Sequence, residues 1–178
     1  MRRVWPATLI VEIVEIKPVA SWGSEQWLNF TGDLVRRPAG AAATGAPRLP
    51  EISGPAPARR EIWEAFRDWS GQFAAAGLAL NALHLDGTGR WTLELTPGAL
   101  TAGRGAAAQQ PAATMVVGRN AAAGKVARFI LALKQGFIEQ VPAMRHIDLR
   151  YPNGFAIRWR DSAAAPQRLP SAQTAAVH

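Results

Sequence analysis

The sequence has no cysteine, only three histidines and no long hydrophobic run. Without cysteine there is no disulfide framework, no thiolate metal site and no cysteine nucleophile. No stretch reaches the roughly 18 uninterrupted apolar residues that a membrane helix needs, and no signal-peptide pattern opens the chain. The histidines are too few to supply a metal site. These absences predict a protein without a metal ion or cofactor.

Positive charge exceeds negative charge, but it is not concentrated in one stretch. The 20 Lys and Arg outnumber the 13 Asp and Glu, which gives a net charge of +7 and a pI near 11.2. Such an excess favours acidic partners, anionic lipid or nucleic acid. The only adjacent basic pairs are Arg2-Arg3, Arg36-Arg37 and Arg59-Arg60, without a recognition helix or an aromatic RNA-binding motif. Binding of nucleic acid is therefore the weaker alternative.

Low-complexity stretches divide the chain into shorter patterned segments. Residues 37–57 and 101–114 are rich in Ala, Gly and Pro, which predicts a linker or long loop and an insertion. The tail 161–178 cannot bury enough apolar surface to become ordered. With 178 residues, 48% of them apolar, the chain has room for one ordinary domain and a fragment of another.

Two segments show the spacing of amphipathic helices. In residues 59–76, apolar side chains recur at spacings of four, three and four, and Gly77 provides the stop. A second helix is expected from a cap at Asn120 to about Gln140. Its predicted buried face consists of Val126, Phe129, Ile130, Leu133 and Phe137, and its predicted wet residues are Lys125, Arg128 and Lys134.

Short, largely apolar runs predict the strands, and the run 9–16 is rich in β-branched side chains. They cover residues 9–16, 18–22, 27–30, 78–84, 90–95 and 115–117. Asp86-Gly87-Thr88-Gly89 is expected to be a hairpin loop and not a phosphate cradle, because no helix begins directly behind it. Helices packed on an antiparallel sheet predict an α+β architecture.

The segment 147–159 is predicted to be the last structured element, a β-hairpin. Its alternation and a three-residue loop, Pro152-Asn153-Gly154 with Gly154 left-handed, agree on one register. That register pairs Tyr151 with Phe155, Leu149 with Ile157, Ile147 with Trp159 and Asp148 with Arg158. A terminal strand at a sheet edge offers unpaired N–H and C=O groups to a partner strand. The alternative is a core hairpin whose edge is covered.

Residues suited to catalysis are sparse. His84 and Asp86 are two apart on a predicted strand, where a carboxylate could orient an imidazole. No nucleophile or second histidine lies near them in sequence. Glu12 and Glu15 are predicted to be strand residues and not a general acid/base pair. The sequence therefore predicts that the protein is not an enzyme.

Four segments, taken together and in order, resemble a known family. They are Val4-Trp5-Pro6 through Leu9–Glu15 to Pro18-Val19-Ala20-Ser21-Trp22; Leu49-Pro50 to Gly54-Pro55; Trp91–Leu95 with Gly118-Arg119 and Ala127-Arg128-Phe129; and Asp148–Tyr151 to Trp159. In combination they span most of residues 1–160 and resemble the bacterial cell-division family FtsQ/DivIB.

The resemblance implies a non-enzymatic scaffold whose extracytoplasmic part holds a POTRA domain followed by a β domain, a curved antiparallel sheet with helices. The family's terminal edge strand pairs with a strand of FtsB within the FtsQ–FtsB–FtsL complex. Carried over residue by residue, the partner-binding positions are Arg119, Arg150, Tyr151, Asn153 and Trp159. The arginines would meet an acidic side chain, and Tyr151 and Trp159 would supply aromatic contact.

The resemblance also implies a division of the chain. Residues 1–22 would be the end of an incomplete POTRA domain, 23–160 the β domain and 161–178 a disordered tail. Family members stand at the periplasmic face of the inner membrane, held by one membrane helix, and this chain is expected to begin after that helix. A general POTRA-type interaction module is a further alternative, but it requires a complete β-α-α-β-β unit, which the sequence lacks.

Overall fold

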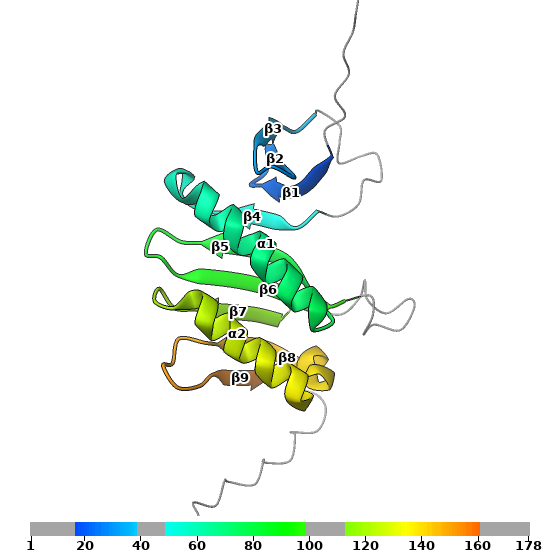
Figure 1. Ribbon diagram of the computed structural model, residues 1–178, viewed down its shortest axis with the longest axis vertical. Helices are drawn as coiled ribbons and strands as arrows, with labels where there is room; N and C mark the ends of the chain where they lie inside the picture. The colour runs from blue at the N-terminus through cyan, green and yellow to red at the C-terminus, as the bar shows by residue number, and fades with distance from the viewer. Residues whose placement is uncertain (1–16, 39–48, 99–112, 161–178) are drawn as a thin grey trace, which may run out of the picture.

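The computed structural model describes residues 17–38, 49–98 and 113–160, and one nine-stranded sheet carries the fold (Figure 1). Its strands are β1 (Pro18–Trp22), β2 (Gln26–Asn29), β3 (Leu34–Arg36), β4 (Glu51–Ser53), β5 (Leu78–Leu85), β6 (Trp91–Pro97), β7 (Ala113–Val117), β8 (Met144–Asp148) and β9 (Ala156–Trp159). Their spatial order is β3-β2-β1-β4-β5-β6-β7-β8-β9. The sheet therefore follows chain order from β4 to β9, with the first three strands reversed.

The α+β fold with a curved sheet and two main helices is confirmed, but the sheet is mixed. Strands β1 and β4, β4 and β5, and β7 and β8 pair in parallel, and the other neighbours are antiparallel. Parallel neighbours need a crossover connection. Helix α1 is that connection between β4 and β5, whereas β2 and β3 lie between β1 and β4 in the chain. Helix α2 and the turns after it connect β7 to β8 in the same way.

One row of apolar residues crosses six strands and forms the centre of the core. Each member pairs in register with the next, and the first five are completely buried. Only the last, on β9, is half-buried. The row is Ile52, Leu83, Leu93, Met115, Ile147 and Ile157. The period of two that buries this row directs the intervening residues to the opposite face of the sheet.

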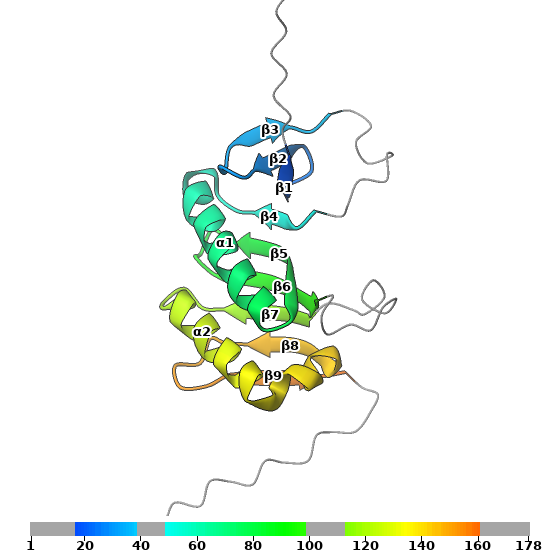
Figure 2. The ribbon, with the colours of Figure 1, turned by 45° about the vertical axis from the view of Figure 1, so that its right-hand side comes forward.

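Helix α1 (Arg59–Ala75) follows a short 3-10 turn (Ala56–Ala58) and lies on the same face of the sheet as α2, as both views show (Figures 1 and 2). Its predicted apolar face is confirmed, and Gly77 leaves the helix with a φ of 76°. The Trp69 ring meets Trp91 of β6 edge-on, with ring centroids 5.1 Å apart. This contact fixes α1 over the middle of the sheet.

Helix α2 (Ala122–Ala132) begins later than the sequence predicts. Asn120 is not its cap, because Ala121 stands at that position in a left-handed conformation with φ of 54° and no side-chain capping bond. A π-type turn (Leu133–Phe137) and a 3-10 helix (Ile138–Ala143) continue the chain to β8. Gly136, with φ of 121°, makes a bend inside the π-type turn. The predicted core residues Val126, Phe129, Ile130 and Leu133 are buried, and Phe137 is half-buried.

Several sequence predictions lie outside the described residues. They are the strand 9–16, most of the insertion 101–114 and the tail 161–178. The division at residues 22 and 160 therefore stays a prediction, although β1 itself pairs with both β2 and β4. Within residues 17–38, 49–98 and 113–160, none of the helices has the length and apolar character that a bilayer crossing requires.

Candidate partner-binding edge

Strand β9 is the last strand of the sheet. It pairs with β8 and with no other strand in the described parts of the chain. Its half-buried residues Ile157 and Trp159 pack against the core, whereas Ala156 and Arg158 are exposed on the other face. The predicted terminal hairpin therefore exists and stands at the edge of the sheet.

The predicted register of this hairpin is wrong by two residues. Ile147 pairs with Ile157, His146 with Arg158 and Asp148 with Ala156, so the strands are joined by residues 149–155 and not by a three-residue loop. Gly154 has no positive φ. The sequence alternation fits both registers, because a shift of two residues keeps every side chain on its face.

Two contacts at the end of β8 select the observed register. The Leu149 N–H donates to the Val116 carbonyl at 2.8 Å, so that Leu149 continues alongside β7 and is buried. One residue earlier, the carboxylate of Asp148 accepts the Arg150 N–H at 3.0 Å, which turns the chain. Asp148 is therefore used at the turn and does not meet Arg158 as predicted.

Asp148 and Arg150 form a bidentate ion pair. Arg150 Nε donates to both carboxylate oxygens at 2.9 and 3.0 Å, and its Nη2 donates to Oδ2 at 2.6 Å. These hydrogen bonds hold the pKa of Asp148 below its usual value, against the raising effect of burial, and they raise the pKa of Arg150. The Asp148 side chain is 12% exposed and that of Arg150 is 56% exposed, so the guanidinium is oriented but remains accessible.

The structure brings Arg119 and Arg150 to the same end of the sheet. Each follows one of the parallel neighbours β7 and β8, whose carboxyl ends lie side by side. A Cβ placed on Gly118 would lie 3.7 Å from Arg150, which shows how closely the two segments approach. Arg119 is exposed, and its aliphatic part lies against Gly89 of the β5–β6 loop.

The two predicted aromatic positions lie at opposite ends of β9. Tyr151, in the loop before the strand, is 54% exposed, and Asn153 beside it is also exposed. Trp159 ends the strand, where it pairs with Met144 at the start of β8 and packs against the core. The alternation predicts that both aromatic residues lie on the buried face. Trp159 does lie there, but Tyr151 does not.

Two cationic residues of α2 contact the loop 149–155, which the sequence does not predict. Lys125 Nζ donates to the Arg150 carbonyl at 3.2 Å, and Arg128 Nη1 donates to the Pro152 carbonyl at 2.7 Å. Both were expected only to stay in water. Their spacing of three along α2 places them on one helix face, but nothing local in the sequence indicates that the loop 149–155 comes to lie there.

Of the residues considered for catalysis, Glu12 and Glu15 lie outside the described residues, and His84 and Asp86 make their described hydrogen bonds with different partners. His84 Nδ1 lies 2.9 Å from Ser53 Oγ, while the Asp86 carboxylate is taken by Thr88 and Arg90 within its own loop. The Thr88 hydroxyl, with the Arg90 backbone N–H, lowers the pKa of Asp86 to about 2. Within the described residues no three His, Asp or Glu side chains gather as metal ligands would.

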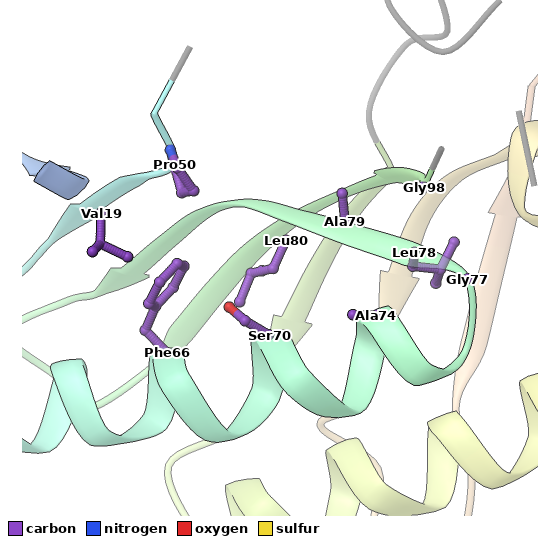
Figure 3. Close-up of a pocket in the computed structure, with 10 residues that line it drawn as sticks. All are labelled: Val19, Pro50, Phe66, Ser70, Ala74, Gly77, Leu78, Ala79, Leu80 and Gly98. Carbon is purple, nitrogen blue, oxygen red and sulfur yellow. The ribbon is translucent and has the colours of Figure 1, made fainter. Parts of the chain in front are cut away.

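A separate apolar groove of ≈ 440 Å³ lies between α1 and the start of β5 (Figure 3). Phe66 and Ser70 reach it from the helix, and Leu78 and Leu80 from the strand. The Ser70 hydroxyl is buried and has no hydrogen-bond partner among the described residues. The strands β6, β7 and β8 separate this groove from β9 in the sheet order, so it is not part of the candidate edge.

Comparison with known proteins identifies the family. Residues 20–150 match the family model described as "Cell division protein FtsQ/DivIB, C-terminal". The curated "Cell division protein FtsQ" of Xanthomonas campestris pv. campestris is 32% identical over 160 residues, covering 90% of this chain and 51% of that protein. The proteins of the same name from Cellvibrio japonicus and Burkholderia pseudomallei are each 29% identical, covering 98% and 89% of this chain and 49% and 58% of theirs.

The chain spans about half the length of the curated relatives it matches. The family model, however, covers more than half of the chain and includes the sheet from the middle of β1 to the end of β8. This chain belongs to the FtsQ/DivIB family of cell-division proteins.

Proposed function

We propose that this chain is the part of a divisome scaffold that binds a strand of FtsB, from the FtsB–FtsL pair, along the open edge of β9. The observation that carries the proposal is the place of β9 at the end of the sheet, paired with β8 alone among the described strands. The whole protein would act without catalysis, at the periplasmic face of the inner membrane, during septum formation.

The backbone of β9 has the orientation that strand addition requires. The Arg160 N–H donates to the Ala143 carbonyl at 2.9 Å, so the backbone of Arg160 faces β8. Backbone groups of successive strand residues point to opposite sides. The N–H and C=O groups of Trp159 and Ile157 therefore point away from β8, toward an incoming strand.

Backbone pairing alone would give weak binding. Strand β9 covers only Ala156–Trp159, and each new hydrogen bond contributes about 1 kcal/mol net, partly offset by ordering the peptide. Side-chain anchors are needed for an affinity of roughly micromolar or better. Tyr151 suits this role because its ring is already exposed beside the edge.

Positive charge at the carboxyl ends of β7 and β8 favours an acidic segment of the partner. Arg150 is held by Asp148 through Nε and Nη2, so its Nη1 is the nitrogen best placed for a second carboxylate. Arg119 follows the neighbouring strand and is exposed. An acidic side chain of FtsB near the loop 149–155 would meet both guanidinium groups.

Overlapping synthetic peptides that cover FtsB of the same organism test the proposal by calorimetric titration. At least one peptide is expected to bind at roughly micromolar affinity. Methylating alternate backbone nitrogens of that peptide gives two variants. Only alternate residues of an added strand direct their N–H groups toward β9. The variant methylated at those nitrogens should not bind, and the variant methylated at the other nitrogens should still bind. Equal binding by both variants, or binding by no peptide, would contradict strand addition.

Exposed aromatic residues at the two ends of the sheet provide a matched pair of variants. Tyr151→Ala is expected to weaken peptide binding at least roughly tenfold. Phe30→Ala is the control, because Phe30 is 70% exposed and lies in the β2–β3 turn, at the other end of the strand order. Its affinity for the peptide should equal that of the unaltered protein.

A further inference from the structure

We infer that three residues on one face of α2, Lys125, Arg128 and Phe129, are positioning residues that hold the loop 149–155 in its binding conformation. This inference rests on the proposed function and adds a part to it. The loop contains Tyr151 and leads directly into β9. The three α2 residues would therefore set how the edge and its aromatic anchor are presented to a partner.

Each of the three residues contacts a different point of the loop. Lys125 Nζ reaches the Arg150 carbonyl at 3.2 Å, and Arg128 Nη1 reaches the Pro152 carbonyl at 2.7 Å. The Phe129 and Phe155 rings meet edge-on at a centroid distance of 5.3 Å. The two hydrogen bonds thus bracket Tyr151, and the ring contact fixes the last loop residue before β9.

The loop depends on these contacts because its own backbone supplies little order. Outside the regular strand ladder, the described backbone bond of residues 149–155 is the one from the Leu149 N–H to Val116, at the first loop position. The side chain of Asp148 orders the next residue, Arg150. Beyond Arg150, the described contacts that restrain the chain are the hydrogen bond from Arg128 and the packing of Phe155 against Phe129 and the rest of the core. Hydrogen bonds from charged donors are the stronger kind, so they suit this purpose.

Gly118 leaves the space through which Lys125 crosses to the loop. A Cβ at Gly118 would lie 3.3 Å from Lys125 Nζ and 3.7 Å from the Arg150 backbone. Neither Lys125 nor Arg128 has an acidic partner among the described ion pairs. Both charges consequently remain available to attract an acidic segment while they hold the loop.

Holding the loop before binding raises affinity because the ordering cost is met in the free protein. Fixing a flexible backbone opposes association, and removing that cost is the basis of preorganisation. Loss of either cationic contact is therefore expected to weaken peptide binding roughly tenfold. The loss should come with greater motion of residues 149–155 in the absence of peptide.

Nitrogen-15 relaxation of the free protein and peptide titration test the inference together. The variants are Lys125→Ala, Arg128→Ala and the conservative Arg128→Lys. Lys134→Ala is the control, because it removes the same charge from an exposed residue beyond α2. Loop order parameters are expected to fall from about 0.85 to below about 0.6 in the two α2 alanine variants. Arg128→Lys should recover part of the loop order and of the affinity, and the control should match the unaltered protein.

The two measurements distinguish this inference from the proposed function. Unchanged loop order in Lys125→Ala and Arg128→Ala would overturn the inference and leave the proposed function standing. Greater loop motion with unchanged peptide affinity would also overturn it, because the loop would then not matter for capture. Failure of the unaltered protein to bind any FtsB peptide would overturn the proposed function itself, and with it the role of α2 in capture.

Discussion

Gly32 packs directly against the indole ring of Trp63. A Cβ placed on Gly32 would lie 2.5 Å from Cδ1 of Trp63, a buried residue of α1. The φ of Gly32 is 87°, a backbone conformation that residues with a Cβ rarely adopt. The β2–β3 turn is therefore fitted to α1 at a point where only glycine has the required shape and backbone freedom.

Replacing Gly32 should destabilise the protein more than replacing a glycine that also has a positive φ but has no atoms close to it. Gly32→Ala is expected to lower the free energy of unfolding by about 3 kcal/mol, about 1 from the left-handed backbone and about 2 from overpacking against the ring. Gly23→Ala should lose only about 1 kcal/mol, because its Cβ would have no atom within 4 Å. Urea unfolding of both variants checks this, and equal losses would contradict the packing argument.

Leu93 occupies the middle of the apolar row that crosses the sheet. It is completely buried, so Leu93→Ala should lower the free energy of unfolding by about 2–5 kcal/mol through lost burial and an unfilled cavity. Leu131→Ala makes the same chemical change at a residue that is 57% exposed on α2. Its effect should stay within about 0.5 kcal/mol. Thermal unfolding followed by circular dichroism would refute the prediction if the two variants melted together.

The Asp148–Arg150 pair predicts a specific dependence of stability on pH. The pKa of Asp148 is lower in the folded protein than in the unfolded chain, where it is about 3.9. Its contribution is therefore complete above that value and is lost as the pH falls through the folded pKa. Because Arg150 is more than half exposed, the contribution should be only about 1 kcal/mol.

Asp148→Asn isolates this contribution. The variant should be less stable than the unaltered protein at pH 7, and the difference should shrink as the pH falls through the lowered pKa of Asp148 in the folded protein. Asp86, whose pKa is lowered to about 2, is present in both proteins and cancels in the comparison. Denaturant unfolding at several pH values measures the difference. Two stability curves that run parallel down to pH 2 would count against the ion pair.

Tyr151 and Trp159 should respond differently to truncation, whatever their role in binding. Tyr151→Ala should change the free energy of unfolding by no more than about 0.5 kcal/mol, because the ring is 54% exposed. Trp159→Ala should lower it by about 2 kcal/mol or more, because the ring packs against the core. Differential scanning calorimetry measures both, and a stable Trp159 variant would show that its ring contributes little to the core.

Elements set by local periodicity could be predicted from the sequence. The spacing of Ile62, Phe66, Trp69 and Phe73 predicts which face α1 buries. Gly77 predicts where the helix ends. Strands β5 and β6 follow from the alternation of Leu and Trp with smaller or polar residues on either side of a Gly-containing turn. The α+β class follows from the order of these elements, since helices and an antiparallel pair must bury their apolar faces against each other.

Relationships set by distant contacts could not be predicted. The parallel pairing of β7 with β8 places the Leu149 N–H on Val116, and this bond decides where the hairpin turns. A shift of two residues leaves the alternation unchanged, so the sequence could not reveal it. For the same reason Lys125 and Arg128 look like ordinary surface residues until α2 is placed beside the loop. The candidate positions Arg119, Arg150, Tyr151, Asn153 and Trp159 came from the family resemblance and their role in binding remains a prediction.

The apolar row from Ile52 to Ile157 does not end at a polar boundary. Its last member, Ile157, is only half-buried, so the sheet's interior layer is left unfinished on that flank. A guest strand lying against β9 would continue this layer by one residue, and that residue must point toward the helix-covered side. If a partner strand adds to β9 as proposed, its apolar residues should alternate so that one of them continues the row beside Ile157, and a sequence displaced by one residue should bind more weakly.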